Sequence, residues 1–282
     1  MSIPPLFDLS ATIAVVSGAA SGMGKASSLA LAAHGATVVL LDRHEAGLAS
    51  TAGAITAAGG RAVPRVHDVA DVEAARRLFE WLDDEFGRVD FLANVAGEGL
   101  LADPLSITDA DLRTVLETLV VARYAHCREA GRRMLRRGRG SIVNIGSLAS
   151  LTALGRGHAA YSMAMGAVAQ MTRELSTEWA ARGVRVNAIL PAQVLNPGLE
   201  RRIDEDAAIR EKWLSGIPRG RLGRPEDIQG LIVLLASDAS SWITGALIPM
   251  DGGNLAMNAG GSIGPQFSED QFSGDQVPGV QA

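Results

Sequence analysis

The sequence predicts one α/β domain built on a doubly wound parallel sheet, and three observations lead to this prediction. Short runs rich in β-branched residues alternate with longer Ala- and Leu-rich stretches of helical period, as in βαβ units. A glycine-rich segment at 17–24 lies where the first strand would pass into the first helix. No internal repeat or Gly/Pro-rich linker divides residues 8–258, so a single domain is expected.

The same alternation places the elements in order along the chain. The β-branched runs predict strands at 12–17, 36–41, 61–66, 89–94, 140–145, 184–190 and 246–250. Apolar residues at helical spacing predict helices at 22–34, 45–58, 71–86, 108–137, 158–182 and 225–236. A further helical stretch at 198–214 has a charged face, which favours an insertion over one end of the sheet.

Composition narrows the class of protein. The chain has 282 residues, of which 47% are hydrophobic and 20% charged, an ordinary globular balance. Its net charge of −5 argues against non-specific nucleic-acid binding. The only cysteine, Cys127, allows no intramolecular disulfide, which suits a reducing cytoplasm. The opening MSIPPLFDLS lacks a signal pattern and no apolar run could span a bilayer, so we expect a cytoplasmic protein with a small-molecule substrate.

The end of the chain differs in composition from the rest. From residue 258 it is rich in Gly, Ser, Gln, Asp and Pro, which cannot bury much apolar surface. We therefore expect residues 1–257 to form the domain, including the substrate pocket. Residues 258–282 should form a flexible tail, unless a partner subunit orders them.

The glycine-rich segment predicts a dinucleotide site of the Rossmann type. Glycines let the chain turn sharply and let a pyrophosphate approach the N-terminus of the next helix, where free N–H groups favour an anion. Such a turn can also be a purely structural connection, but its place between a strand and a helix favours nucleotide binding. The candidate contacts are Gly18, Ser21, Gly22, Met23 and Gly24.

Asp42, at the end of the second predicted strand, bears on the choice of dinucleotide. A carboxylate there accepts hydrogen bonds from the ribose hydroxyls and repels a 2′-phosphate. It could also be an ordinary strand-end Asp in a turn. Its spacing from the glycines favours NAD over NADP, although the neighbouring Arg43 could tolerate a phosphate.

Later motifs, in order, resemble the short-chain dehydrogenase/reductase family over nearly the whole domain. They are Asp68-Val69, Asn94-Val95-Ala96-Gly97, the strand from Gly140 to Ser147, the strand from Val184 to Ile189, Gly223-Arg224-Pro225-Glu226-Asp227-Ile228, Ile243-Thr244-Gly245 and Asp251-Gly252-Gly253. The resemblance implies a seven-stranded parallel sheet with helices on both faces. It also implies a tetramer, or at least a dimer, built on the fourth and fifth helices.

The resemblance extends the set of candidate cofactor residues. In the family, the Asp of the Asp-Val pair contacts the adenine amino group, and Asn-Asn-Ala-Gly ends the fourth strand. A Thr after the sixth strand bonds the nicotinamide carboxamide, and here Asn196 could take that role, with Gln193 nearby on the substrate side. The added candidates for the cofactor are Asp68, Val69, Asn94, Ala96, Gly97 and Asn196.

The proton-transfer residues match the family only in part. In the family, a Tyr is general acid/base, a Ser bonds the substrate oxygen, a Lys one turn after the Tyr holds the nicotinamide ribose, and an Asn anchors a water leading to that Lys. Tyr161 and Ser147 match the first two. Met165 stands in place of the Lys and Leu119 in place of the Asn, although a one-residue slip would put Thr118 there.

The loss of the Lys has a direct physical consequence. A phenol ordinarily ionises near pH 10, and a neighbouring cation stabilises the phenolate, whereas an apolar Met does not. Alcohol oxidation should therefore be slow near neutral pH unless another cation has moved in. Because Met165 and Leu119 depart together, the sequence favours a rebuilt site over random decay.

Three residues could supply the cation in place of the missing Lys. Arg123 and His126 lie four and seven residues after Leu119, on one helical face. That pattern favours an interface ion pair or a solvated edge over catalysis. His158, three residues before Tyr161, could reach the substrate pocket or be an ordinary loop histidine.

The leading hypothesis is an NAD(H)-dependent oxidoreductase that interconverts a carbonyl and an alcohol, with Tyr161 and Ser147 at the oxygen. The sequence looks most like the branch of the family that acts on sugar acids, polyols and related small alcohols. Possible pocket residues are His158, Gln193 and Met165, and no metal site is indicated. A redox-neutral reaction with a tightly held cofactor and a catalytically impaired scaffold remain alternatives.

Overall fold

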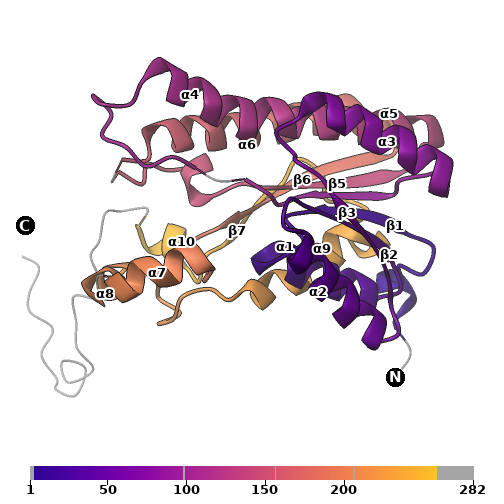
Figure 1. Cartoon of the computed structure of the whole chain (residues 1–282), viewed down its shortest axis with the longest axis horizontal. Helices are drawn as coiled ribbons and strands as arrows, with labels where there is room; N and C mark the ends of the chain where they lie inside the picture. Colours follow the sequence, from indigo (N-terminus) through magenta and orange to yellow (C-terminus); the bar gives the residue numbers. More distant parts are fainter. Residues whose placement is uncertain (1–2, 98, 156, 206, 259–282) are drawn as a thin grey trace, which may run out of the picture.

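The computed structural model describes residues 3–97, 99–155, 157–205 and 207–258, and the statements below concern these residues. Its strands form one parallel sheet in the order β3-β2-β1-β4-β5-β6-β7, which confirms the predicted fold class (Figure 1). The strands are β1 (Ile13–Ser17), β2 (Thr37–Asp42), β3 (Arg61–Val66), β4 (Phe91–Asn94), β5 (Gly140–Ile145), β6 (Val184–Pro191) and β7 (Leu247–Met250). The order reverses between β1 and β4, and ligands of such sheets bind at that switch point, beyond the carboxyl ends of the strands.

Helices cover both faces of the sheet, with α1, α2 and α9 on one side and α3, α5 and α6 on the other (Figure 1). The α-helices are α1 (Gly22–Ala33), α2 (Glu45–Ala57), α3 (Val72–Phe86), α4 (Asp109–Leu116), α5 (Ala122–Arg137), α6 (Ala159–Trp179), α7 (Pro197–Glu205), α8 (Ala207–Leu214), α9 (Gln229–Ala236) and α10 (Asn254–Asn258). Short 3₁₀ turns are η1 (Pro5–Phe7), η3 (Leu148–Ser150), η4 (Ala180–Arg182), η5 (Pro225–Ile228) and η6 (Asp238–Ser240).

The core explains why the strands read as continuous apolar runs. Alternate residues of β1 point to opposite faces, so Ala14 and Val16 join one buried cluster while Val15 joins another. The first cluster includes Leu31 of α1 and the second includes Phe79 of α3. A strand buried on both faces needs apolar side chains at every position, which is the pattern that the sequence shows.

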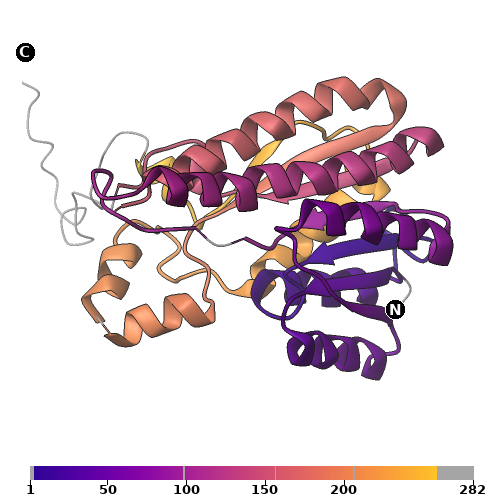
Figure 2. The ribbon, with the colours of Figure 1, turned by 45° about the horizontal axis from the view of Figure 1, so that its top comes forward.

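Two predicted helical stretches are interrupted in the structure. The stretch at 108–137 contains a π-helical turn, η2 (Glu117–Val121), between α4 and α5. Such turns widen a helix by one residue and occur often at functional sites. The stretch at 198–214 forms two helices, α7 and α8, which project beyond the carboxyl end of β6 (Figure 2). The predicted tail begins at 258, but Asn258 is the last residue of α10, and the rest of the tail, 259–282, lies outside the described residues. Among the described helices, none has the length and apolarity that crossing a membrane requires.

Candidate active site

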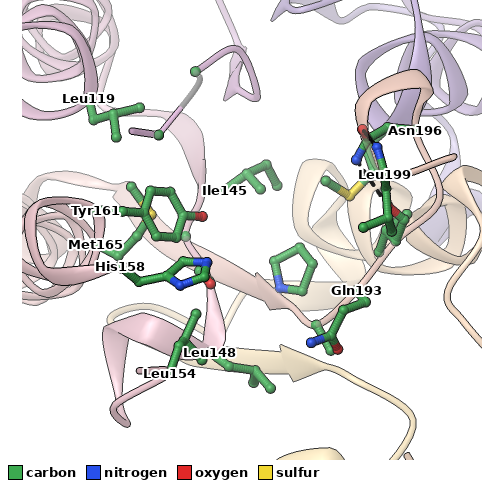
Figure 3. Close-up of a pocket in the computed structure, with 18 of the residues that line it drawn as sticks. Leu119, Ile145, Leu148, Leu154, His158, Tyr161, Met165, Gln193, Asn196 and Leu199 are labelled. Atoms are coloured by element: carbon green, nitrogen blue, oxygen red, sulfur yellow. Dashed lines mark hydrogen bonds between the residues drawn. The ribbon is translucent and has the colours of Figure 1, made fainter. Parts of the chain in front are cut away.

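A cavity of about 580 Å³ opens at the carboxyl ends of the central strands (Figure 3). The loops after β4, β5 and β6, the start of α6 and the π-helical turn all contribute to its walls. Met23 of the glycine-rich segment also lines it, so that segment and the cavity adjoin. The cavity walls carry polar and apolar surface in similar amounts, and Leu119, Leu148, Leu154 and Leu199 are visible around the space in Figure 3.

Tyr161 projects into this cavity from the first turn of α6, with its hydroxyl toward the open space (Figure 3). The ring of His158 lies edge-on to it, with ring centroids 6.1 Å apart. The other side of the phenol ring packs on the loop after β4, because a Cβ atom at Gly99 would lie 2.4 Å from Cδ2 of Tyr161. A glycine is therefore required at this position, and the close contact fixes the direction of the phenol.

Ser147 follows β5 and faces the same cavity. Its hydroxyl oxygen caps η3 by accepting from the Ala149 N–H at 3.2 Å. Since the oxygen accepts in that bond, the hydroxyl proton can be donated to a substrate oxygen. Ser150, in the same turn, donates to the main-chain oxygen of Met165 at 2.9 Å and so ties the loop to α6. Tyr161 and Ser147 are thus held on two linked elements.

Two glycines of the glycine-rich segment, Gly18 and Gly24, are packed too tightly for a side chain. Gly18 has φ of 71°, and a Cβ there would lie 3.1 Å from the Ala96 nitrogen. A Cβ at Gly24 would lie 2.0 Å from the carbonyl oxygen of Gly18. Ser17 adds a tie, since its hydroxyl oxygen accepts from the N–H groups of Val95 (3.0 Å) and Ala96 (3.1 Å). The segment is therefore pressed against the end of β4, with the start of α1 beside it.

Of the two predicted carboxylate contacts, Asp42 adjoins this segment and Asp68 lies in the loop after β3. Asp42 ends β2 and accepts from the N–H groups of Ala20 (3.2 Å) and His44 (3.0 Å). The bond to Ala20 fixes the carboxylate against the glycine-rich segment, whereas Arg43 is exposed. Asp68 is exposed as well and accepts from the N–H of Ala70 at 2.9 Å, with Val69 half-buried beside it.

Asn94 is occupied in the interior. Its amide donates to the side-chain oxygen of Asn144 at 2.9 Å and to the sulfur of Cys127 at 3.2 Å. Asn144 in turn donates to the Thr172 hydroxyl at 3.1 Å, which completes a buried link between β4, β5 and α6. A cofactor contact by Asn94 therefore stays a prediction. Because its side-chain amide is engaged in the interior, the main chain would have to make that contact.

Asn196 is also engaged, but at a helix end. Its side-chain oxygen accepts from the N–H groups of Gly198 and Leu199, both at 3.0 Å, and its amide donates to the Val194 oxygen at 3.1 Å. Asn196 thus caps α7, a role for which Asn is among the preferred residues. One amide N–H is left for a carboxamide, and that contact stays a prediction.

Gln193 faces the cavity from the loop after β6 (Figure 3). Its side-chain oxygen is buried and has no hydrogen-bond partner among the described residues. Buried polar atoms in native proteins nearly always have a partner, so an orphan acceptor at a cavity wall points to a ligand that donates. A hydroxyl group has the required chemistry.

Met165 and Leu119 lie together beneath Tyr161. Met165 is 2% exposed and Leu119 1% exposed, and both belong to one apolar cluster against which Tyr161 packs. Leu119 lines the cavity, whereas the Thr118 hydroxyl turns away and donates to the Thr114 oxygen at 2.9 Å. Leu119 and Met165 thus form an apolar floor of the cavity, and their correspondence to the family's Asn and Lys stays a prediction.

Arg123 is buried inside the chain, with 5% of its surface exposed. Its guanidinium donates to the main-chain oxygen of Ile145, at the end of β5, and to that of Ala96, after β4, at 3.2 Å. The expectation of a solvated edge is therefore wrong for Arg123. Its carbonyl partners come from strand ends distant in sequence, so the local pattern held no signal for them.

His126 is buried as well, with 1% exposed, so a solvated edge is wrong here too. Its Nε2 lies 2.9 Å from Nε2 of His67, and its Nδ1 lies 2.8 Å from the oxygen of Ala122. Burial lowers the pKa of His67 to about 4 and also lowers the pKa of His126. The two rings therefore form a neutral interior pair, away from the residues that line the cavity.

Comparison with known proteins agrees with this architecture. A family profile described as Enoyl-(Acyl carrier protein) reductase matches residues 18–254. Galactitol 2-dehydrogenase (L-tagatose-forming) of Cereibacter sphaeroides is 38% identical over 90% of this chain and 98% of its own. D-threitol dehydrogenase of Mycolicibacterium smegmatis is 36% identical over 88% of this chain and 94% of its own.

A solved structure extends the likeness to three dimensions. It comes from Beutenbergia cavernae, is assigned as an NAD(P)-dependent gluconate 5-dehydrogenase, and holds NADP at low occupancy. It superposes with a TM-score of 0.84 at 39% identity, over 89% of this chain and 99% of its own. A matching profile over most of the domain, full-length relatives and a shared fold lead to one conclusion. The chain belongs to the short-chain dehydrogenase/reductase family.

Proposed function

We propose that this protein is an NAD(H)-dependent oxidoreductase that interconverts a carbonyl and an alcohol of a small polar substrate. The observation that carries the proposal is the single cavity shared by Tyr161, Ser147 and Met23. A proton donor, a hydrogen-bond donor and the end of a glycine-rich turn thereby meet at one space. The scaffold alternative does not explain why a phenol should be held with its hydroxyl toward that space, whereas a redox-neutral reaction with a bound cofactor would use the same phenol.

The glycine-rich segment fits a dinucleotide. Close packing at Gly18 and Gly24 excludes side chains, and no side chain caps the N-terminus of α1 at Ser21. Its first N–H groups are therefore left for a pyrophosphate. Asp42, Asp68 and the turn at Ala96 and Gly97 would hold the adenosine and nicotinamide ends. When bound, a nicotinamide dinucleotide supplies the hydride donor or acceptor.

The chain's own residues supply the proton and the orientation. The Tyr161 hydroxyl gives a proton to the substrate oxygen in reduction and takes it back in oxidation. The Ser147 hydroxyl donates a hydrogen bond to the same oxygen, which places the carbonyl carbon. The Gln193 oxygen accepts from a further substrate hydroxyl, and His158 offers a second polar contact beside Tyr161. The leucine walls limit the access of water.

Substrates with several hydroxyl groups fit this arrangement, and relatives named for galactitol and D-threitol support that class. We expect turnover of at least one polyol or sugar acid in a panel that includes galactitol, D-threitol and gluconate, assayed from neutral to strongly alkaline pH. The rate should rise with pH, because a phenolate is the base in the oxidation direction. Dinucleotide binding without turnover at any pH would favour the redox-neutral or scaffold alternative.

The preference for NAD is proposed from Asp42. A carboxylate fixed against the glycine-rich segment repels a 2′-phosphate, so NAD(H) should bind more tightly than NADP(H). Replacing Asp42 by Ser should reverse or erase that preference, and fluorescence titration with both cofactors measures it. NADP bound in the solved relative makes this a sharp test. Tighter NADP(H) binding by the unaltered protein would refute the assignment and implicate Arg43, which Arg43→Ala then checks.

Assembly and location complete the proposal. Val121 at the end of η2, Tyr124 in the first turn of α5 and Met163 on α6 expose large apolar surfaces. Such side chains on neighbouring helices are suited to a subunit interface, which supports a homotetramer or a dimer. A cytoplasmic location agrees with a chain whose one cysteine, Cys127, is free and buried.

A further inference from the structure

The cavity holds a cation that does not come from the helix of Tyr161. Arg123, on α5, lines the same walls as Tyr161 and Ser147. Among the described lining residues it is the only one with a permanent charge. A Cβ at Gly97 would lie 3.4 Å from Nη2 of Arg123 and 2.5 Å from Cδ2 of Leu119, so the guanidinium reaches past Leu119 toward the loop after β4.

Two main-chain oxygens hold this guanidinium in place. The Ile145 and Ala96 oxygens accept its hydrogen bonds, and in the described part of the chain no carboxylate pairs with it. Carbonyl oxygens orient a guanidinium without cancelling its formal charge. Arg133, on the same helix, is different, because Asp83 and Glu129 neutralise it at 2.6 and 3.1 Å. Arg123 therefore keeps a net positive charge beside the cavity.

The other titratable groups near Tyr161 and Arg123 do not supply that charge. Burial raises the pKa of the Cys127 thiol, beside Arg123, to about 12, so it stays neutral. Burial lowers the pKa of Arg123, while Cys127 and Tyr161 raise it, and a guanidinium remains protonated in proteins. His158 lies edge-on to Tyr161 and carries no permanent charge.

We propose that Arg123 is the positioning residue whose guanidinium stabilises the phenolate of Tyr161. It does so from α5, whereas the lysine of the family lies on the helix of the tyrosine, which is α6 here. The inference rests on the proposed function, since it assigns the cation to the same acid/base group. Arg123 and Tyr161 line one cavity and interact electrostatically. A positive charge near an acid favours its ionised form, and the low-dielectric floor of Met165 and Leu119 strengthens that interaction. The apolar floor and the buried arginine are then two parts of one arrangement.

A direct test needs no turnover. The chain has two tyrosines, so Tyr124→Phe leaves Tyr161 as the only one. We expect its tyrosinate absorbance to develop at higher pH when Arg123→Met is added to this background. The matched control is Arg133→Met, which removes a buried charge from the same helix and should leave the titration unchanged. Equal titrations with and without the Arg123 guanidinium would overturn the inference, whatever the substrate panel shows.

Kinetics provide the second readout. Arg123→Met should lower kcat/KM near pH 7 by about 10- to 100-fold and recover much of that loss at alkaline pH, one tenfold step for each pH unit of displacement. Arg123→Lys should keep most of the pH profile, because it keeps the charge. A loss of equal size at every pH would show that Arg123 only ties β4 to β5. If Arg123→Met does not fold, Arg123→Gln, which can still donate to one carbonyl, replaces it in both experiments.

Discussion

Tyr161→Phe is expected to lower kcat/KM by about 10²- to 10⁴-fold while leaving dinucleotide affinity nearly unchanged. The phenol hydroxyl is the group that the structure directs into the cavity beside Ser147, and Phe removes it without changing the ring that packs on Gly99. Absorbance of the reduced nicotinamide follows the rate, and fluorescence titration follows binding. The control is Tyr124→Phe, which alters the exposed tyrosine of α5 and should keep full activity.

The opposite result would be equally informative. Full activity in Tyr161→Phe would refute the role assigned to this residue. Attention would then turn to His158, whose ring lies beside the same space, or to a reaction that needs no proton donor from the protein. A proportional loss of dinucleotide affinity would instead mean that the ring serves the cofactor and not the substrate oxygen.

Met165→Lys is expected to destabilise the protein without raising its activity. An ammonium at this position would enter an apolar cluster that is almost fully buried, with Arg123 already present as a like charge at the same cavity. An uncompensated buried charge costs about 3–5 kcal/mol in the free energy of unfolding. Urea denaturation measures that loss, and the dehydrogenase assay measures the rate.

A matched control exists on the same helix. Gln170 is a polar, exposed residue of α6, so Gln170→Lys places its ammonium in water and should leave stability within about 0.5 kcal/mol. An increase of activity at neutral pH in Met165→Lys, with a lower pH optimum, would contradict the rebuilt site. It would show an ordinary site that has merely lost its lysine.

The fold was predictable because its signals are local. Apolar β-branched runs define the strands. Helix α3 begins after the N-cap Asp71 and ends at the C-cap Gly87, whose φ of 65° favours glycine. The start of α7 has a local signal too. Asn196 followed by Pro197 is the signature of a helix N-cap and first position, and it predicts the capping of α7.

The polar interior of the site was less predictable because it depends on pairs distant in sequence. Arg123 meets the oxygens of Ala96 and Ile145, which are ends of two other strands, and His126 meets His67 from the loop after β3. A helical period shows which side chains share a face. It does not show whether that face meets water, another subunit or a row of carbonyl oxygens, so burial of a charge there could not be inferred.

The π-helical turn at Glu117–Val121 controls the rotational phase of everything that follows it on α5. One residue of an α-helix corresponds to about 100° of rotation, so a regular helix through this segment would carry Arg123 around the axis and away from Ala96 and Ile145. The position of the Arg123 guanidinium thus depends on the extra residue in the π-helical turn as well as on the arginine side chain. A single-residue deletion in this turn would act like the loss of the arginine itself, and homologous chains that lack the turn could hold an arginine at the aligned position without its guanidinium reaching these two carbonyl oxygens.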